Sequence, residues 1–560
     1  MNVIVQNQYK AVLLSSLQKV FQDTQPQYQP ECLVFTALKE ELFSFQMAYT
    51  SKQEIIEYAT VNVISPIEKY IRVREVIEIP SAYPCHSVTD DNYLRTKPGL
   101  YPDLLRDLKN NMVQVLPNRW KSLWIDVQTS QDIPAGKHPI TIQMFSQEGE
   151  LMISQHTEIT IFDVILPKQQ LIHTQWFHGD CLADYYQVPV FSERHWEIMQ
   201  NFIQTAANHG INMILTPQFT PPLDTAQGGE RTTIQLIDVI KEGKQYSFGF
   251  DKLQRWIKMC LDVGIEYFEF SHLFTQWGVT SAPKVMATVD GVYQKLFGWD
   301  TPAVGGAYTE FLKIYLPQLT QKLKEWGVEK RCWFHISDEP SLQHLENYQA
   351  AKASVAEELE GFTLIDALSN YEFYKTGAVQ IPVCANNHIE PFLKHHVKRL
   401  WSYYCTAQKI DVSNRFFSMP SARNRIYGIQ VYKYDIEGIL HWGYNFYNSQ
   451  HSIDTINPYQ VSDALNAFPS GDPFIVYPKA DGTAEESIRL MVQTHMIADI
   501  RAMKLLEQLT SKEFVMSFVE GDLASPITFS SYPKSDFYFV ALRNRINREI
   551  AKCMNKQLGK

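Results

Sequence analysis

From residue 173 onward, the sequence alternates between short strand-like segments and amphipathic helical segments. The strand-like segments are rich in aromatic and β-branched residues, which favour buried strands. Helical patterns at 193–208, 251–264, 308–326 and 342–358 separate several of them. Strands that alternate with helices predict a parallel sheet, and eight strands close a (β/α)8 barrel. The eight predicted strands are 173–180, 211–219, 266–274, 331–339, 363–369, 381–386, 400–405 and 438–446.

A doubly wound open sheet is the alternative arrangement of such strands and helices. Nucleotide-binding versions of that fold carry a GxGxxG or Walker loop after a strand, and neither motif occurs in this sequence. The insert at 275–306 is long for a connection in an α/β unit, and loops of this length usually shape a pocket. The closed barrel is therefore our prediction, with the insert beside its functional face.

Residues 1–165 follow a different pattern. The first 20 residues fit a helix, and the remainder consists of short alternating runs separated by Pro, Gly, Asp and Asn, which is typical of a β-sandwich. After a barrel at 166–510, residues 511–560 predict a short extension with a strand and a basic helix, RNRINREIAK. The predicted fold class is a multidomain α/β protein: an N-terminal β-sandwich, a (β/α)8 TIM barrel and a C-terminal extension.

Charge and cysteine content limit which binding partners and which cellular compartment we expect. A net charge of -10 argues against a basic groove that follows phosphates, so we expect no nucleic acid partner. No stretch reaches the ~18 apolar residues that a membrane span needs, and the first residues lack the pattern of a signal peptide. The eight cysteines show no CxxC spacing, which fits free thiols. These features predict a cytoplasmic protein without a membrane span, and they leave its oligomeric state open.

The fourth predicted strand ends in two adjacent carboxylates. Asp338 and Glu339 follow the strand-like run RCWFHIS, and Pro340 then ends the strand because it has no N–H to donate. In a (β/α)8 barrel, catalytic groups lie where strands end and βα loops begin. The structural alternative is that the two acids only favour the start of the next helix through its dipole. The position predicts a catalytic pair.

Most of the other predicted strand ends also carry polar or aromatic residues. No HxH or HExxH spacing marks the histidines, so we predict no metal site and no cofactor. Tyr403 and Trp442 could equally fill the barrel core. Glu230 and Arg231 in the segment GGERTT predict an internal ion pair. The predicted substrate-binding residues are His178, Asp180, His272, Trp277, His335, Tyr403, Arg425, Trp442 and Asn445.

Two adjacent acids suit glycoside hydrolysis, which needs a protonated carboxyl for the leaving oxygen and a second group that stabilises the anomeric carbon. Mutual repulsion keeps one member protonated near neutral pH, and we give the donor role to Glu339. The seventh predicted strand, LWSYYC, ends without an acid. The nucleophile would then be the 2-acetamido oxygen of the substrate, with Asp338 orienting the amide and stabilising the oxazolinium ion.

Two alternatives stay open at this point. A retaining glycosidase with two protein carboxylates would use a further acid, such as Glu269 or Glu372, and would accept sugars without an acetamido group. A non-catalytic glycan-binding protein would keep the cleft and bind sugars without turnover. No GxSxG elbow supports a serine nucleophile.

Five segments together resemble one family. They are WFHGDCLADYY, LTPQFTPPLDT, HLFTQWG, HISDEP and YGIQVYKYDIEGILHWGYN, within a resemblance that covers about residues 20–510. The chain resembles glycoside hydrolase family 123, the β-N-acetylgalactosaminidases. The resemblance implies a β-sandwich followed by a barrel, and retaining, substrate-assisted, exo-acting release of terminal β-linked N-acetylgalactosamine from a glycan. It implies catalysis by Asp338 and Glu339 and an aromatic cleft formed by Trp277, Tyr403 and Trp442.

Overall fold

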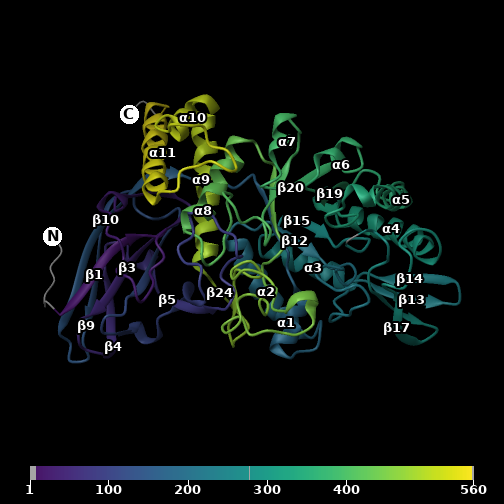
Figure 1. The fold of residues 1–560 in the computed structure, drawn as a ribbon, viewed down its shortest axis with the longest axis horizontal. Coiled ribbons are helices and arrows are strands. Elements are labelled where there is room, and N and C mark those ends of the chain that lie inside the picture. Colours follow the sequence, from purple (N-terminus) through teal and green to yellow (C-terminus); the bar gives the residue numbers. More distant parts are fainter. Residues whose placement is uncertain (1–7, 277, 558–560) are drawn as a thin grey trace.

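The computed structural model describes residues 8–276 and 278–557. Within them, eight parallel strands close into a barrel in chain order, which confirms all eight predicted barrel strands. The barrel lies beside the N-terminal strands, and long helices stand between them (Figure 1). Its strands are β11 (Ile172–Gln175), β12 (Met213–Thr216), β15 (Tyr267–Phe270), β18 (Cys332–Phe334), β19 (Thr363–Ala367), β20 (Ile381–Ala385), β21 (Trp401–Tyr403) and β22 (Gly438–His441).

Bulky apolar side chains fill the barrel interior. Met213, Leu215, Val383 and Trp401 belong to one buried cluster, as expected for an interior packed in layers. Gly438 on β22 leaves room for this packing, because a Cβ at that position would lie 2.3 Å from the Trp401 ring. The barrel is thus a solid core, and any binding site lies at one of its ends.

Amphipathic helices cover the barrel. In α4 (Ala307–Glu325), Tyr308, Phe311 and Tyr315 recur every three or four residues and are buried. At the start of α2, the Ser192 hydroxyl accepts the backbone N–H of His195 at 3.3 Å and caps the helix. The other helices between Gly179 and Leu509 are α1 (Gly179–Tyr186), α2 (Glu193–Asn208), α3 (Asp251–Asp262), α5 (Leu345–Val355), α6 (Tyr371–Lys375), α7 (Glu390–Lys394), α8 (Ser421–Lys433) and α9 (Ile488–Leu509).

Two long βα loops build a small four-stranded sheet. The loop after β12 forms β13 (Asp238–Glu242) and β14 (Gln245–Gly249), and the loop after β15 forms β16 (Val285–Val289) and β17 (Val292–Phe297). This sheet lies at the end of the molecule opposite the N-terminal strands (Figure 1). The insert predicted to shape a pocket therefore folds together with a neighbouring loop.

The N-terminal region consists of two five-stranded sheets, ordered β1-β3-β8-β5-β6 and β2-β10-β9-β4-β7. Apolar residues from both sheets form one shared core. All their pairings are antiparallel except that of β2 with β10. The strands are β1 (Tyr9–Ser15), β2 (Phe35–Lys39), β3 (Glu41–Ser51), β4 (Ile56–Ile64), β5 (Ile71–Ser81), β6 (Gly99–Asp107), β7 (Met112–Val115), β8 (Lys121–Thr129), β9 (Gly136–Phe145) and β10 (Leu151–Ile165).

Both ends of the chain differ from the prediction. The first 20 residues do not form the predicted helix over the part that is described, because β1 pairs with β3 in an antiparallel ladder. After residue 485, the described residues form no strand, so the strand predicted in the extension is wrong. The extension forms α10 (Lys512–Glu520) and α11 (Asp536–Gln557). The basic segment of α11 is partly buried, with Arg543 paired to Glu41 and Asp499.

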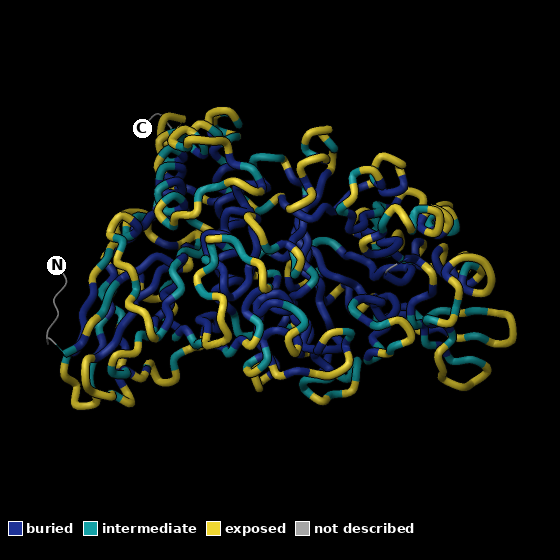
Figure 2. The backbone as a smooth tube through the Cα atoms, viewed as in Figure 1, coloured by how far each residue is buried: buried dark blue, intermediate teal, exposed yellow. Residues whose placement is uncertain are grey.

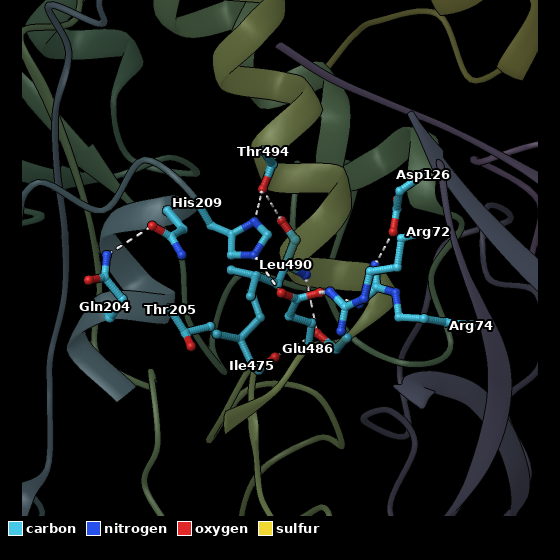
Figure 3. Close-up of polar contacts among 12 residues, drawn as sticks. Arg72, Arg74, Asp126, Gln204, Thr205, His209, Ile475, Glu486, Leu490 and Thr494 are labelled. Carbon is cyan, nitrogen blue, oxygen red and sulfur yellow. Dashed lines mark hydrogen bonds and ion pairs between the residues drawn. The ribbon is translucent and has the colours of Figure 1, made fainter. Parts of the chain in front are cut away.

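A buried charge network joins the N-terminal sheets to the barrel (Figure 3). Glu486, just before α9, pairs with Arg72 and Arg74 of β5 and lies 3.1 Å from Nε2 of His209. Burial raises the pKa of a carboxyl, but His209 and the two arginines together hold the pKa of Glu486 well below its usual range. Arg74 also pairs with Asp126 at 2.5 Å. The network fixes β5 against the barrel.

Buried backbone runs through the barrel and the N-terminal sheets, and exposed segments lie at the periphery (Figure 2). All eight cysteines are unpaired, as predicted. Among the described residues, no helix combines the length and apolar character that crossing a bilayer would require.

Candidate active site

A pocket of about 260 Å³ lies at the carboxyl ends of the barrel strands. This is the face on which (β/α)8 barrels carry their catalytic groups. Loops that follow strands on opposite sides of the barrel contribute to it, and Asp224, Asp338 and Glu339 are its acids among the described residues. Its apolar wall is formed by Trp176, Leu223, Ala367, Leu440, Trp442 and Phe468.

Asp338 is buried at the base of this pocket, with 8% of its surface exposed. Its Oδ2 accepts a hydrogen bond of 2.7 Å from Nε2 of Gln276. Burial and, after it, the negative charge of Glu339 raise the pKa of Asp338 to about 7. Asp338 is therefore partly protonated near neutral pH. The predicted proton donor, Glu339, is the other member of the pair.

Glu339 is the exposed member of the pair. Its backbone has φ of 47°, a left-handed conformation that is strained for a residue with a long side chain. The Tyr403 hydroxyl, at the end of β21, donates a hydrogen bond to Oε1 of Glu339. The strained turn places two successive carboxyls in one pocket, although successive residues of a regular strand point to opposite faces.

A second set of charges lies beneath the pair. Nε2 of His335 is 2.7 Å from Oε1 of Glu269, and Nδ1 is 3.3 Å from Oδ1 of Asp366. Burial lowers the pKa of an imidazole, but the hydrogen bonds to Asp366 and Glu269 outweigh it and raise the pKa of His335 to about 9. His335 is thus an imidazolium held between two carboxylates, and it supports the acid pair from below without lining the pocket.

Asp366, on β19, fixes the backbone that leads to the acid pair. Its Oδ1 accepts the backbone N–H of Ile336 at 3.0 Å and that of Ser337 at 3.3 Å. The Tyr348 hydroxyl donates to its other oxygen. The buried carboxyl of Asp366 therefore fixes the backbone at residues 336 and 337.

Asp366→Asn should therefore destabilise the protein. The variant keeps an oxygen acceptor for the loop but removes the negative charge that faces His335, and losing a hydrogen bond between charged groups costs about 2 kcal/mol. We expect a lower melting temperature by differential scanning calorimetry than for wild type. Glu372→Gln is the control, because Glu372 is exposed on α6 and pairs only with Lys375 at 2.9 Å in the described contacts. Equal melting temperatures of the two variants would contradict the role given to Asp366.

Of the predicted substrate-binding residues, three line the pocket: His178, Tyr403 and Trp442. Asn445 does not line it: its Oδ1 accepts the backbone N–H of His178 at 2.9 Å, and its Nδ2 donates to the carbonyl of His178 at 3.0 Å. Asn445 therefore fixes the loop that carries His178, and it contacts no pocket space.

The structure contradicts two predictions: that Asp180 contacts substrate and that Arg231 pairs with Glu230. Asp180 and Arg231 are buried and pair with each other at 2.6 Å. Glu230 instead pairs with Lys284 at 2.8 Å and with Lys295 at 2.7 Å. Asp180 thus ties α1 to the loop after β12, because its carboxylate is occupied by a guanidinium.

Three other predicted contacts lie elsewhere. His272 is buried against His335, with ring centroids 4.3 Å apart, and lies outside the pocket lining. Arg425 is on α8 and pairs with Asp499 of α9 at 2.7 Å, on the side that faces the N-terminal sheets. Trp277 lies outside the described residues.

Among the residues that the structure describes, one group of side chains lies close enough together to hold a metal ion. Ligand atoms of His272, His335 and Asp366 lie within 4.8 Å of one another. Both nitrogens of His335 already face carboxylates, and the two imidazole rings are tilted by only 30°. Because both of these nitrogens donate to carboxylates, His335 has no lone pair left for an ion. We therefore assign this cluster to charge pairing.

Several pocket residues have weak signals in the sequence. Gln276 belongs to the HLFTQWG segment, where its neighbour Trp277 attracted the prediction. Asp224 is the penultimate residue of the LTPQFTPPLDT segment, which follows the second predicted strand. Phe468 comes from the long connection between β22 and α9, where nothing local marks a pocket residue.

An eight-stranded parallel barrel whose strand-end pocket combines two adjacent carboxyls with aromatic walls is the arrangement of a glycoside hydrolase. The sequence family described as glycoside hydrolase 123, catalytic domain, matches residues 176–506. The chain therefore belongs to glycoside hydrolase family 123, as the resemblance predicted.

One solved structure shares this fold over nearly the whole chain. A family 123 glycoside hydrolase from Clostridium perfringens, described in terms of glycolipid glycan hydrolysis, matches with a TM-score of 0.77 and 13% identity over 99% of this chain and 100% of that chain. The β-glucuronidase of Parabacteroides merdae matches with a TM-score of 0.29 and 8% identity over 81% and 49% of the two chains. The comparison with curated proteins finds no match.

Proposed function

We propose that the protein is an exo-acting β-N-acetylgalactosaminidase that retains anomeric configuration by substrate-assisted catalysis. The observation that carries this proposal is the position of the candidate nucleophiles. Glu269 is fully buried, and its two oxygens accept from Trp176, Thr174 and His335. Glu372 pairs with Lys375 on a helix outside the pocket. Since neither acid can reach an anomeric carbon in the pocket, the acetamido oxygen of the substrate is the better nucleophile.

The pair acts in two steps in this mechanism. Asp338 accepts the amide N–H of the 2-acetamido group and holds its oxygen below the anomeric carbon, while Glu339 protonates the leaving oxygen. The C–O bond to the leaving group breaks as the acetamido oxygen bonds to the anomeric carbon, which gives an oxazolinium ion. Glu339 then takes a proton from water, whose oxygen bonds to the anomeric carbon as the bond between that carbon and the acetamido oxygen breaks. The Tyr403 hydroxyl, which lines the pocket and donates to Glu339, is the donor that we assign to the acetamido oxygen.

The charge of the pocket supports an uncharged terminal sugar. Among the described lining residues there are three acids and neither Lys nor Arg. A sulfated sugar or a uronic acid would be repelled in such a site. The apolar rings of Trp176, Trp442 and Phe468 offer stacking surface for the less polar face of a sugar. We further propose that the two N-terminal sheets form a β-sandwich that supports the barrel through the Glu486 network.

A pH profile tests the protonation of Asp338. We expect kcat/KM to rise as the pH rises through about 7, because the pKa of Asp338 is about 7 and only its ionised form accepts the acetamido N–H. Initial rates on an aryl N-acetyl-β-galactosaminide at constant ionic strength measure this acid limb. A rate that is the same at pH 5 and at pH 8 would contradict the role given to Asp338.

The substrate test uses two aryl β-glycosides with the same leaving group, an N-acetylgalactosaminide and a galactoside. Cleavage of the first alone, with the β-anomer as the first product in the ¹H NMR spectrum, supports the proposal. Cleavage of the galactoside would favour the two-carboxylate mechanism, for which Asp224 is the remaining acid in the pocket. Binding of N-acetylgalactosamine without cleavage of either substrate would indicate a glycan-binding protein.

A further inference from the structure

Gln276 makes two hydrogen bonds that fix how its amide is oriented. Its Nε2 donates to Oδ2 of Asp338 at 2.7 Å, and its Oε1 accepts the backbone N–H of Asp224 at 2.9 Å. A backbone N–H can only donate, so the amide oxygen must face Asp224 and the amide nitrogen must face Asp338. The side chain is 9% exposed. Gln276 therefore presents a donor to Asp338 and cannot turn to present an acceptor.

Asp224, which binds the amide oxygen of Gln276, is itself held by the loop after β22. Oδ2 of Asp224 accepts the backbone N–H of His451 at 3.0 Å, and its carbonyl oxygen accepts the Ser452 hydroxyl at 3.0 Å. Asp224 has φ of 39°, a strained conformation that such contacts stabilise. Hydrogen bonds thus connect the loops after β22, β12 and β15 in series, and the last bond of the series is made to Asp338.

A fixed donor stabilises the ionised form of Asp338, which accepts hydrogen bonds, relative to its protonated form. The hydrogen bond from Gln276 and the positive charge of His335 lower the pKa of Asp338, whereas burial, Glu339 and Asp366 raise it. Glu339 has a different environment, since it is exposed and receives the Tyr403 hydroxyl. The ionised form of Asp338 therefore depends on the donor that Gln276 supplies.

We propose that Gln276 is a positioning residue that keeps Asp338 in the ionised form that accepts hydrogen bonds. By donating to Asp338, it leaves that carboxyl an acceptor for the acetamido N–H, while Glu339 serves the leaving oxygen. The inference rests on the proposed function of the pair, and it adds the residue that selects the productive protonation state. Asp224 and the loop after β22 hold Gln276 in the orientation that this requires.

The test compares Gln276→Leu and Gln276→Glu with a matched control. The control is Gln235→Leu. Gln235 is 8% exposed and does not line the pocket. Its Nε2 bridges the loops after β12 and β15, because it donates to the carbonyl of Ile237 at 2.7 Å and to that of Met286 at 2.9 Å. The readouts are kcat, KM and the pH profile on the aryl N-acetylgalactosaminide. A carboxyl ¹³C NMR titration follows the Asp338 signal, identified by its loss in Asp338→Asn.

We expect Gln276→Leu to raise the pKa of Asp338 by about one unit and to lower kcat by about 10- to 100-fold, with KM within about threefold. The acid limb of the pH profile moves to higher pH. Gln276→Glu keeps the acceptor for the Asp224 N–H and places a second charge beside Asp338, so it raises that pKa further. Gln235→Leu changes only the melting temperature.

An Asp338 titration that is the same in wild type, Gln276→Leu and Gln276→Glu would overturn the proposal, even if both variants lost activity. Should the wild-type protein cleave no N-acetylgalactosaminide, the proposed function fails, and the titration still decides whether Gln276 controls the protonation of Asp338. Gln276→Glu supplies the same comparison if Gln276→Leu does not fold.

Discussion

Glu339→Gln is expected to lower kcat/KM by about 10³-fold on a substrate whose leaving group is another sugar, because a general acid contributes about 10²- to 10⁴-fold. On a 2,4-dinitrophenyl glycoside, whose leaving group needs no proton, the loss should be at least tenfold smaller. Glutamine keeps the size of the side chain and accepts the Tyr403 hydrogen bond. The variant thus separates proton donation from packing.

The control for this variant is Glu372→Gln, an exposed acid that does not line the pocket. It should keep wild-type rates on both substrates. An equal loss for Glu339→Gln on the good and the poor leaving group would mean that Glu339 does not donate the proton.

Asp338→Asn is expected to lower kcat by about 10³-fold on the N-acetylgalactosaminide, whatever the leaving group, because stabilising donors and acceptors at a developing charge contribute about 10²- to 10³-fold each. Asparagine can present an N–H to the acetamido N–H, and it no longer balances the charge of an oxazolinium ion. Inhibition by N-acetylgalactosamine thiazoline, which imitates that ion, should weaken in parallel. The isothermal titration of the thiazoline measures this directly.

Asp536→Asn is the matched control for Asp338→Asn. Asp536 begins α11, far from the pocket lining, and burial raises its pKa to about 6, so it resembles Asp338 as a carboxyl held partly protonated by its surroundings. It should keep the wild-type kcat and thiazoline affinity. An Asp338→Asn variant that hydrolyses the substrate at the wild-type rate would contradict the assignment of the pair.

The barrel could be predicted from the sequence because its strands are local signals. Each strand is a short apolar run between turn residues, and parallel strands buried on both faces favour such runs. The first 20 residues fit a helix equally well, and only the distant partner β3 decides that they form β1. In the C-terminal extension, residues 521–535 lie between two helices and pair with no strand in the described structure.

The acid pair could also be predicted locally, since Asp338 and Glu339 follow a strand directly. The roles of other polar residues depend on partners far away in the sequence. Arg425 is bound by Asp499, and Asp180 by Arg231. Those partners are set by packing between helices and loops, so spacing alone placed both residues wrongly among the residues that point into the pocket.

The most direct test of the central claim is the rate on aryl β-galactosaminides whose N-acyl group carries zero, one, two or three fluorine atoms. Fluorine withdraws electrons from the acyl oxygen and leaves the shape of the sugar nearly unchanged. If that oxygen attacks the anomeric carbon, as proposed, kcat/KM falls steeply with each fluorine, while Asp338 and Glu339 remain unaltered. A rate that does not depend on the number of fluorine atoms would contradict acetamido participation and require a nucleophile from the protein.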